Sequence, residues 1–137
     1  MPWYGFIHPV LAVGTLVYGV RAAQVSMSKV LDWDFPLRRQ RTRSIIFFLL
    51  CIANLIVGFA ANALMRGRGL DVRLTAHLPL AIVVIAFALV AAVVTYTRPP
   101  RPGTVSGLMK LHHWFLIIPS VLILSMGFTG LLKAFGL

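Results

Sequence analysis

Acidic side chains are scarce in this sequence of 137 residues, which has three Asp plus Glu against 13 Lys plus Arg. Charged residues of both signs make up 12% of the chain, whereas hydrophobic residues make up 59%. A globular domain needs roughly a quarter of its residues charged to cover its surface. The low charged fraction and the high hydrophobic fraction therefore argue against a water-soluble enzyme and predict an integral membrane protein.

Cysteine is nearly absent as well, since Cys51 is the single one. One cysteine cannot form an intrachain disulfide, and no Cys-x-x-Cys-His motif is present to attach a c-type haem, so any haem here is expected to be non-covalent. A net charge of +10 would suggest nucleic acid in a soluble protein. Here the cations lie between long apolar runs, so we interpret them as topology signals and expect no nucleic-acid partner.

Long apolar runs are what the sequence has instead. About 20 apolar residues cross a hydrocarbon core of about 30 Å, and the chain offers that length four times with short basic links between. We predict an all-α membrane fold, a four-transmembrane-helix up-and-down bundle that forms a single integral-membrane domain over residues 1–137. The predicted spans cover about residues 3–24, 44–65, 74–97 and 111–132. The first span lacks a basic leader and a clear cleavage site, so we expect a helix there and not a secretory signal.

The distribution of cations predicts the orientation of the bundle. Nine of them fall in the links after spans one and three: Arg21, Lys29, Arg38, Arg39, Arg41, Arg43, Arg98, Arg101 and Lys110. The other four are Arg66, Arg68, Arg73 and Lys133. The positive-inside rule then places the two basic links in the cytoplasm and both termini outside, in a multi-pass protein of the bacterial inner membrane. The first link, residues 27–43, is expected to lie on the membrane surface or to bind a partner.

The predicted spans contain no carboxylate, and this absence excludes several kinds of chemistry. Proton-coupled or cation-coupled transport usually relies on a buried Asp or Glu, so a small transporter or channel component is the weakest hypothesis. No Gly-x-Ser-x-Gly motif is present for hydrolysis, and no catalytic residue is predicted. The four histidines are split between the two membrane faces, which argues against a zinc site.

Two of the histidines fall at matching depth on parallel helices. His8 is about one and a half turns into span one from the outer face, and His77 lies at a similar depth in span three. Both imidazoles can therefore project into the bundle core as axial ligands of one haem b iron, the geometry of a b-type cytochrome. Arg73 lies one turn before His77 and is expected to neutralise haem propionates, with Arg66 and Arg68 nearby.

The other two histidines open span four on the cytoplasmic side. His112 would need a partner ligand at the same depth, and span two offers none. Met27 or Met109, in or beside the links, is the alternative source of a ligand through its thioether, but a second haem is not expected. Adjacent residues point about 100° apart on a helix, so at most one of the pair faces the core, and we expect His113 to be the interfacial one. Without any ligand, all four histidines are also tolerable as interfacial residues that donate to carbonyls or water.

Several short motifs resemble one family of membrane proteins. The motifs are His8-Pro9, Thr75-Ala76-His77, Lys110-Leu111-His112 and Thr129-Gly130. They resemble small bacterial four-helix transmembrane b-type cytochromes, which are related to ascorbate-reducible and ferric-reductase-like membrane cytochromes. The resemblance implies that spans one and three share one haem through His8 and His77, and that His112 is half of a second pair. The family's histidine in span two is missing, since Arg43-Ser44 stands there.

We therefore expect a membrane electron-transfer subunit that works within an oxidoreductase complex rather than as a stand-alone enzyme. Its expected partners are other membrane subunits, lipids, a quinol and a periplasmic cytochrome, because a lone haem near one face cannot carry charge across about 30 Å of hydrocarbon. The alternative is a haem-free structural subunit of a respiratory or photosynthetic membrane complex that retains some histidines. The missing histidine in span two favours this alternative.

Small and polar residues inside the spans have simpler interpretations. Glycines are common at bundle interfaces because they allow close packing, and we expect this role, rather than room for a flat macrocycle, for Gly14, Gly19, Gly58, Gly127 and Gly130. Asn54 and Asn62 lie on nearly one face of span two and are expected to hydrogen-bond to a neighbouring helix or subunit. Cys51 is expected to be a buried small hydrophobe.

Overall fold

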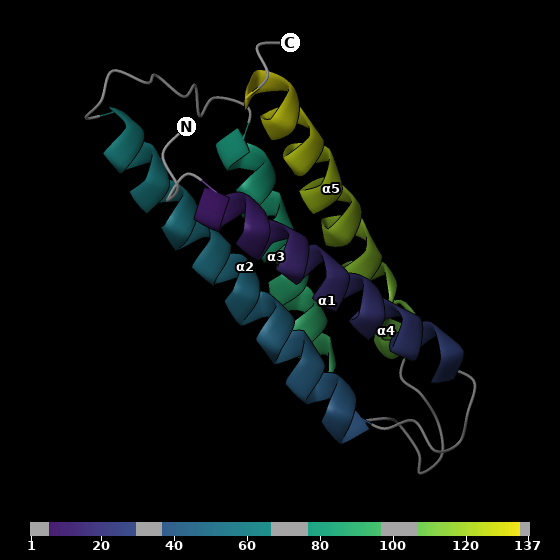
Figure 1. Cartoon of the computed structure of the whole chain (residues 1–137). Coiled ribbons are helices and arrows are strands. Elements are labelled where there is room, and N and C mark those ends of the chain that lie inside the picture. The colour runs from purple at the N-terminus through teal and green to yellow at the C-terminus, as the bar shows by residue number, and fades with distance from the viewer. Residues whose placement is uncertain (1–5, 30–36, 67–76, 97–106, 135–137) are drawn as a thin grey trace.

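The computed structural model describes residues 6–29, 37–66, 77–96 and 107–134. These residues form α1 (Ile7–Lys29), α2 (Leu37–Arg66), α3 (His77–Val94), α4 (Gly107–Lys110) and α5 (Trp114–Ala134). Four of the helices run the length of a bundle, and α4 is a single turn joined to α5 (Figure 1). The predicted all-α fold with four long apolar helices is confirmed.

The apolar surface of these helices identifies a multi-pass membrane protein. Each of the four candidate spans has an 18-residue window with mean hydropathy between 1.4 and 2.7, of which only 17% to 28% is buried inside the bundle. The rest of each span presents large apolar side chains outward, such as Val13 and Ile56. In water such a surface would be unstable, whereas hydrocarbon is its natural solvent.

The four long helices pack in a ring. α1 packs on α2 and α5, and α3 packs on the same two helices, so α1 and α3 face each other diagonally across the bundle. The core near the middle contains Phe47 and Leu116, both fully buried, together with small alanines from α1 and α3. Cys51 lies in this cluster, as expected.

One close helix crossing depends on a glycine. A Cβ built on Gly19 of α1 would lie 2.5 Å from Phe47 Cε2 and 2.6 Å from Ser120 Oγ, so α1 could not approach α2 and α5 this closely with a larger residue. Gly58 also packs tightly, against His8. The packing prediction was wrong for Gly14 and Gly127, because a Cβ at either position would meet no described atom within 4 Å. The surroundings of Gly130 lie outside the described residues.

The helix boundaries differ from the predicted spans at the basic end. α2 begins at Leu37, seven residues before the predicted start, so Arg38 to Arg43 are helical rather than part of a link. At 30 residues α2 is about 45 Å long, which exceeds the thickness of the hydrocarbon core. α1 likewise continues to Lys29. The remainder of the first link, residues 30–36, lies outside the described residues.

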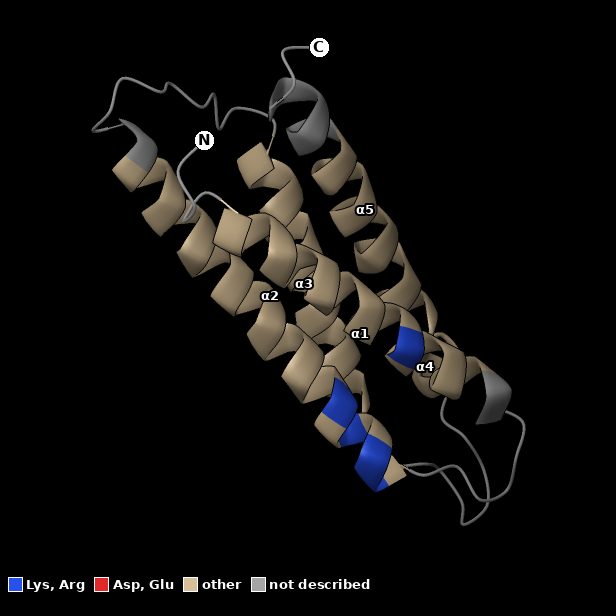
Figure 2. Cartoon of the chain, in the orientation of Figure 1, with Lys and Arg blue, Asp and Glu red and all other residues tan. Residues whose placement is uncertain are grey.

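The cations whose side chains the structure describes gather at one end of the bundle. Figure 2 shows the ribbon segments of Lys and Arg residues in blue, on the first turns of α2 and on the neighbouring part of α1. The cations with described side chains are Arg21, Arg38, Arg39, Arg41, Arg43 and Lys110. We call this end the basic end, and the end where α1 and α3 begin the histidine end.

Candidate functional site

His8 and His77 meet at the histidine end. His8 lies in the first turn of α1 and His77 begins α3, and their ring centroids are 6.1 Å apart with an angle of 68° between the planes. Because α1 and α3 are diagonal partners, this contact spans the end of the bundle from one side to the other, and both side chains are half-buried there. The structure therefore brings together the two histidines that the sequence paired by depth.

The surroundings of His8 are tight and incompletely hydrogen-bonded. A Cβ on Gly58 of α2 would lie 3.1 Å from His8 Cε1 and 3.4 Å from Nδ1, so the absence of a side chain at Gly58 makes room for the imidazole. The Nδ1 atom of His8 is buried and has no hydrogen-bond partner among the described residues. A buried polar atom without a partner costs roughly 1–3 kcal/mol, so this nitrogen is where the site can gain an interaction.

Three cations predicted near this site cannot be placed. Arg73 and Arg68 lie outside the described residues, and the side chain of Arg66 is also outside them. The suggested contact of Arg73 with haem propionates thus stays a prediction. In the part of the chain that is described, no group of three or more His, Cys, Asp or Glu side chains could hold a metal ion. A pair of imidazoles is enough for haem, which supplies its own four equatorial nitrogens.

His112 occupies the opposite end and is fully buried. It lies in the turn between α4 and α5 rather than opening a helix as predicted. Its Nε2 is 3.0 Å from the backbone oxygen of Ala91 in α3 and 3.0 Å from Ser44 Oγ in α2. Its Nδ1 is 3.1 Å from Ser26 Oγ in α1 and 3.5 Å from Gln40 Nε2 in α2. One imidazole therefore links all four long helices.

The partners determine which nitrogen of His112 carries the proton. The carbonyl of Ala91 can only accept, so Nε2 bears the hydrogen and donates to it. Ser44 Oγ donates its only hydrogen to the backbone carbonyl oxygen of Gln40 over 2.9 Å. Toward His112 Nε2 the hydroxyl can therefore only accept. Nδ1 is then the acceptor for Ser26 and Gln40.

This network leaves neither nitrogen of His112 free for a metal. The sequence placed His112 among the cofactor-binding residues as half of a second haem pair, but the structure surrounds it with protein groups instead. These partners were missed because they come from three other helices. The only signal in the sequence was the occurrence of Ser26, Gln40 and Ser44 near the same ends of their helices.

His113 is the outer member of the pair, as expected. Its side chain is partly exposed and its ring lies 5.3 Å from that of Trp114, which is exposed. An aromatic residue with a polar partner at a helix end is typical of a membrane interface. Nδ1 of His113 is buried without a partner in the described part of the chain.

Asn54 forms the interhelical hydrogen bond that the sequence predicted. Its Nδ2 donates to Thr15 Oγ1 in α1 over 2.5 Å and also to the carbonyl of Leu50 over 3.0 Å. Thr15 Oγ1 in turn donates to the carbonyl of Leu11 over 2.8 Å. These linked hydrogen bonds join α2 to α1 one helical turn away from Gly58, on the same side of α2. The other asparagine of the pair, Asn62, is buried as well, and no described residue pairs with its Oδ1.

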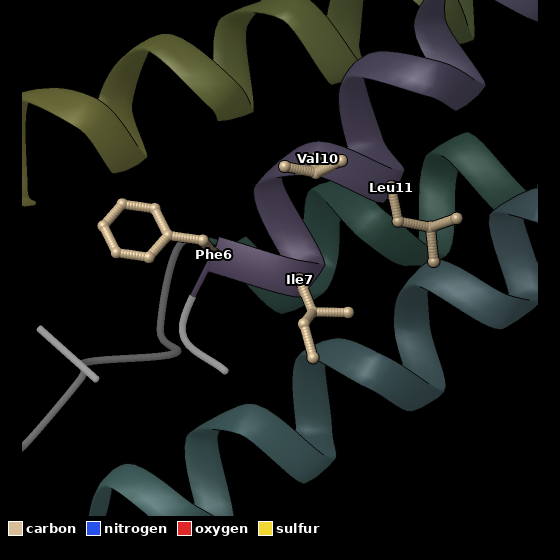
Figure 3. Close-up of a pocket in the computed structure, with 4 residues that line it drawn as sticks. All are labelled: Phe6, Ile7, Val10 and Leu11. Atoms are coloured by element: carbon tan, nitrogen blue, oxygen red, sulfur yellow. The ribbon is translucent and has the colours of Figure 1, made fainter. Parts of the chain in front are cut away.

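An open hollow lies beside the start of α1. It has a volume of about 400 Å³ and is lined by Phe6, Ile7, Val10 and Leu11, whose side chains spread out from the first turns of the helix (Figure 3). All four side chains are apolar, so the hollow suits hydrocarbon and offers no side-chain hydrogen bond to a polar ligand. It lies on the outer surface of the bundle, beside the first turn of α1 that also carries His8.

Comparison of the chain with protein families, with curated proteins and with solved structures returns no match.

Proposed function

We propose that this protein is a membrane electron-transfer subunit, a b-type cytochrome that holds one non-covalent haem between His8 and His77. The observation that carries the proposal is the meeting of these two imidazoles across the end of the bundle. They come from helices that do not pack closely against each other, so their contact is not a by-product of helix packing.

The separation of the two rings fits ligands of a shared iron. A ring nitrogen bonds a transition metal at about 2 Å, so two imidazoles on opposite sides of one iron have centroids roughly 6 Å apart. The observed centroid distance is 6.1 Å. The rings meet in a T-shaped contact with an angle of 68° between their planes, so each would have to turn one nitrogen toward a shared iron.

The residues around His8 also fit a positioned ligand. Gly58 leaves space on α2 for the ring and limits where it can move. In a histidine ligand one ring nitrogen binds the metal and the other donates to a neighbouring acceptor. Nδ1 of His8 is buried and unpaired among the described residues, so it is available for either role. Asn54 Oδ1, one turn from Gly58, is a buried acceptor that also lacks a partner among the described residues.

A haem with two imidazole ligands supplies reversible one-electron transfer, without an open position for a substrate. His8 and His77 would hold it at the histidine end. At the basic end both ring nitrogens of His112 are hydrogen-bonded to protein groups, so this histidine offers no ligand for a second haem. Electrons would therefore enter and leave on one side, with a quinol as donor and a periplasmic cytochrome or another membrane subunit as acceptor.

The basic end supports the proposed orientation. The six described cations at that end would face the cytoplasm of a bacterial cell by the positive-inside rule. The histidine end and both chain termini would then lie outside, in the inner membrane, within reach of periplasmic partners.

A reduced-minus-oxidised visible spectrum with a pyridine haemochrome assay tests the proposal. We expect a b-type spectrum with about one haem per chain, which is lost in both His8→Ala and His77→Ala. His113→Ala is the matched control, since it removes a histidine at the other end of the bundle and should leave the haem content unchanged. No haem in gently isolated wild-type protein would overturn the proposal.

The second candidate is a haem-free structural subunit of a respiratory or photosynthetic membrane complex. The arrangement around His112 favours it, because a histidine that the resemblance assigns to haem serves as a packing element instead. In that case His8→Ala and His77→Ala would alter assembly with partner subunits and leave the visible spectrum unchanged.

A further inference from the structure

The basic end carries a charge that the described part of the chain does not neutralise. Six cations gather there, and no Asp or Glu occurs among the described residues (Figure 2). An uncompensated cluster of cations at the surface of a bilayer creates a positive potential that attracts anions. The position of each guanidinium then decides where an anion can bind.

Arg41 is held by the protein. Its Nη2 donates to the backbone oxygen of Thr95 over 3.2 Å, and its Cζ lies 4.0 Å above the ring of Tyr96. A cation at the last carbonyls of α3 satisfies free acceptors and interacts favourably with the helix dipole. Arg41 therefore fastens α2 to the end of α3.

Arg43 has no such partner. Its side chain is partly buried, and its Nη1 atom is inaccessible to solvent and makes no hydrogen bond to any described residue. Arg43 is two residues from Arg41 and so points to the opposite flank of α2, toward α1, where it lies within electrostatic range of the Tyr18 phenol. A buried charged donor without an acceptor is costly. Arg41 Nε is also buried without a described partner, but Arg41 is held through Nη2, so Arg43 is the guanidinium that a bound anion stabilises most.

A second arginine lies on the same flank. Arg39 is four residues before Arg43 and therefore one turn away on the same stripe of α2, and its side chain is exposed. The apolar part of the helix begins just after Arg43, so both guanidinium groups lie at the level of the lipid headgroups. The acceptors present at that depth in a bilayer are lipid phosphates.

We propose that the flank of α2 formed by Arg39 and Arg43 binds the phosphate of an anionic phospholipid, with the two guanidinium groups as donors. Planar guanidinium groups bind phosphate oxygens in pairs, which gives the site its geometry. The cations around the site, which no described carboxylate neutralises, select a lipid with net negative charge over a zwitterionic one. This inference does not depend on the proposed haem.

Native mass spectrometry of the full chain in neutral detergent tests the proposal, with phosphatidylglycerol and phosphatidylcholine added in equal amounts. We expect wild-type protein to retain phosphatidylglycerol preferentially. Arg43→Gln and Arg39→Gln should each reduce the ratio of bound phosphatidylglycerol to phosphatidylcholine about fivefold, the effect expected for one arginine at a membrane surface. Because both lipids are counted on the same molecules, the ratio does not depend on the yield of folded protein.

Arg38→Gln is the matched control. It removes the same charge from the same turn of α2 but lies off the Arg39–Arg43 stripe, so the ratio should stay within about twofold of wild type. Equal losses in Arg38→Gln and Arg43→Gln would overturn the proposal and indicate diffuse attraction to the surface. Displacement of the lipid by millimolar inorganic phosphate would overturn it in favour of a free-anion site. Lipid binding only after Asp32→Asn with Asp34→Asn would also overturn it, because the chain's own carboxylates would then occupy Arg43.

Discussion

The imidazole of His112 donates from Nε2 to the backbone carbonyl of Ala91 over 3.0 Å. The acceptor belongs to the main chain of α3, so no side-chain substitution in α3 removes it. The other three partners of His112 are side chains from α1 and α2. A single buried residue in the turn between α4 and α5 thus determines how the four long helices meet at the basic end.

His112→Ala should be the most destabilising single substitution among the histidines. It removes a fully buried ring and leaves the Ala91 carbonyl and the side chain of Gln40 short of a partner, so we expect a loss of about 2–4 kcal/mol in the free energy of unfolding. The measurement is chemical unfolding in mild detergent followed by circular dichroism. His113→Ala serves as the control, and an equally large loss there would contradict this role of His112.

Gly19→Ala should weaken the bundle, whereas Gly14→Ala on the same helix should not. The new Cβ at Gly19 would lie 2.5 Å from Phe47 and 2.6 Å from Ser120, which forces α1 away from α2 and α5. Overpacking of this kind costs about 1–3 kcal/mol. The Cβ at Gly14 meets no described atom within 4 Å, so that variant should unfold at or slightly above the wild-type midpoint. Thermal unfolding of the two variants side by side gives the comparison, and equal midpoints would show that the crossing is not tight.

Asn54 and Thr15 should be energetically coupled. A double-mutant cycle with Asn54→Ala and Thr15→Ala isolates their hydrogen bond, and interhelical bonds of this kind contribute about 1 kcal/mol within membranes. The cycle is measured by unfolding in mild detergent. Strictly additive effects of the two substitutions would mean that the contact does not stabilise the α1–α2 pair.

The sequence predicted those features that follow from length and depth alone. Four apolar runs of sufficient length imply four helices, and an up-and-down order makes spans one and three parallel. Residues at equal distance from the outer face then lie at one level, which is why the pairing of His8 with His77 could be predicted. Whether the side chains of His8 and His77 point toward each other depends on the rotation of each helix about its axis, and helix packing determines that rotation.

The features that could not be predicted depend on contacts between distant segments. Arg38 to Arg43 were taken for a link because a run of cations is atypical of a span, but α2 continues past the hydrocarbon and keeps them helical. The partners of His112 lie 21 to 86 residues away in the sequence. No local pattern connects such positions, so only the assembled bundle shows that this histidine is enclosed by protein groups.

Gly58→Ala should disturb the proposed haem site without unfolding the bundle. Its Cβ would lie 3.1 Å from His8 Cε1, so the ring must move by a few tenths of an ångström. We expect a lower haem content or shifted absorption bands in the reduced protein, with helical content unchanged. Gly127→Ala is the control, because it adds a methyl group in open space on α5 and should leave the spectrum unchanged. An unaltered spectrum in Gly58→Ala would place His8 outside the haem site.

The orientation of the chain should be measurable with single cysteines in a Cys51→Ala background, since Cys51 is the native thiol and is buried. Phe6→Cys lies at the histidine end and Lys110→Cys at the basic end, and both side chains are exposed. If the basic end faces the cytoplasm, an impermeant maleimide added to intact cells should label Phe6→Cys. It should label Lys110→Cys only after the membrane is permeabilised.

The reverse pattern would put the His8–His77 pair on the cytoplasmic side. Its electron acceptor would then have to be a cytoplasmic protein, because the pair would lie about 30 Å of hydrocarbon away from any periplasmic cytochrome.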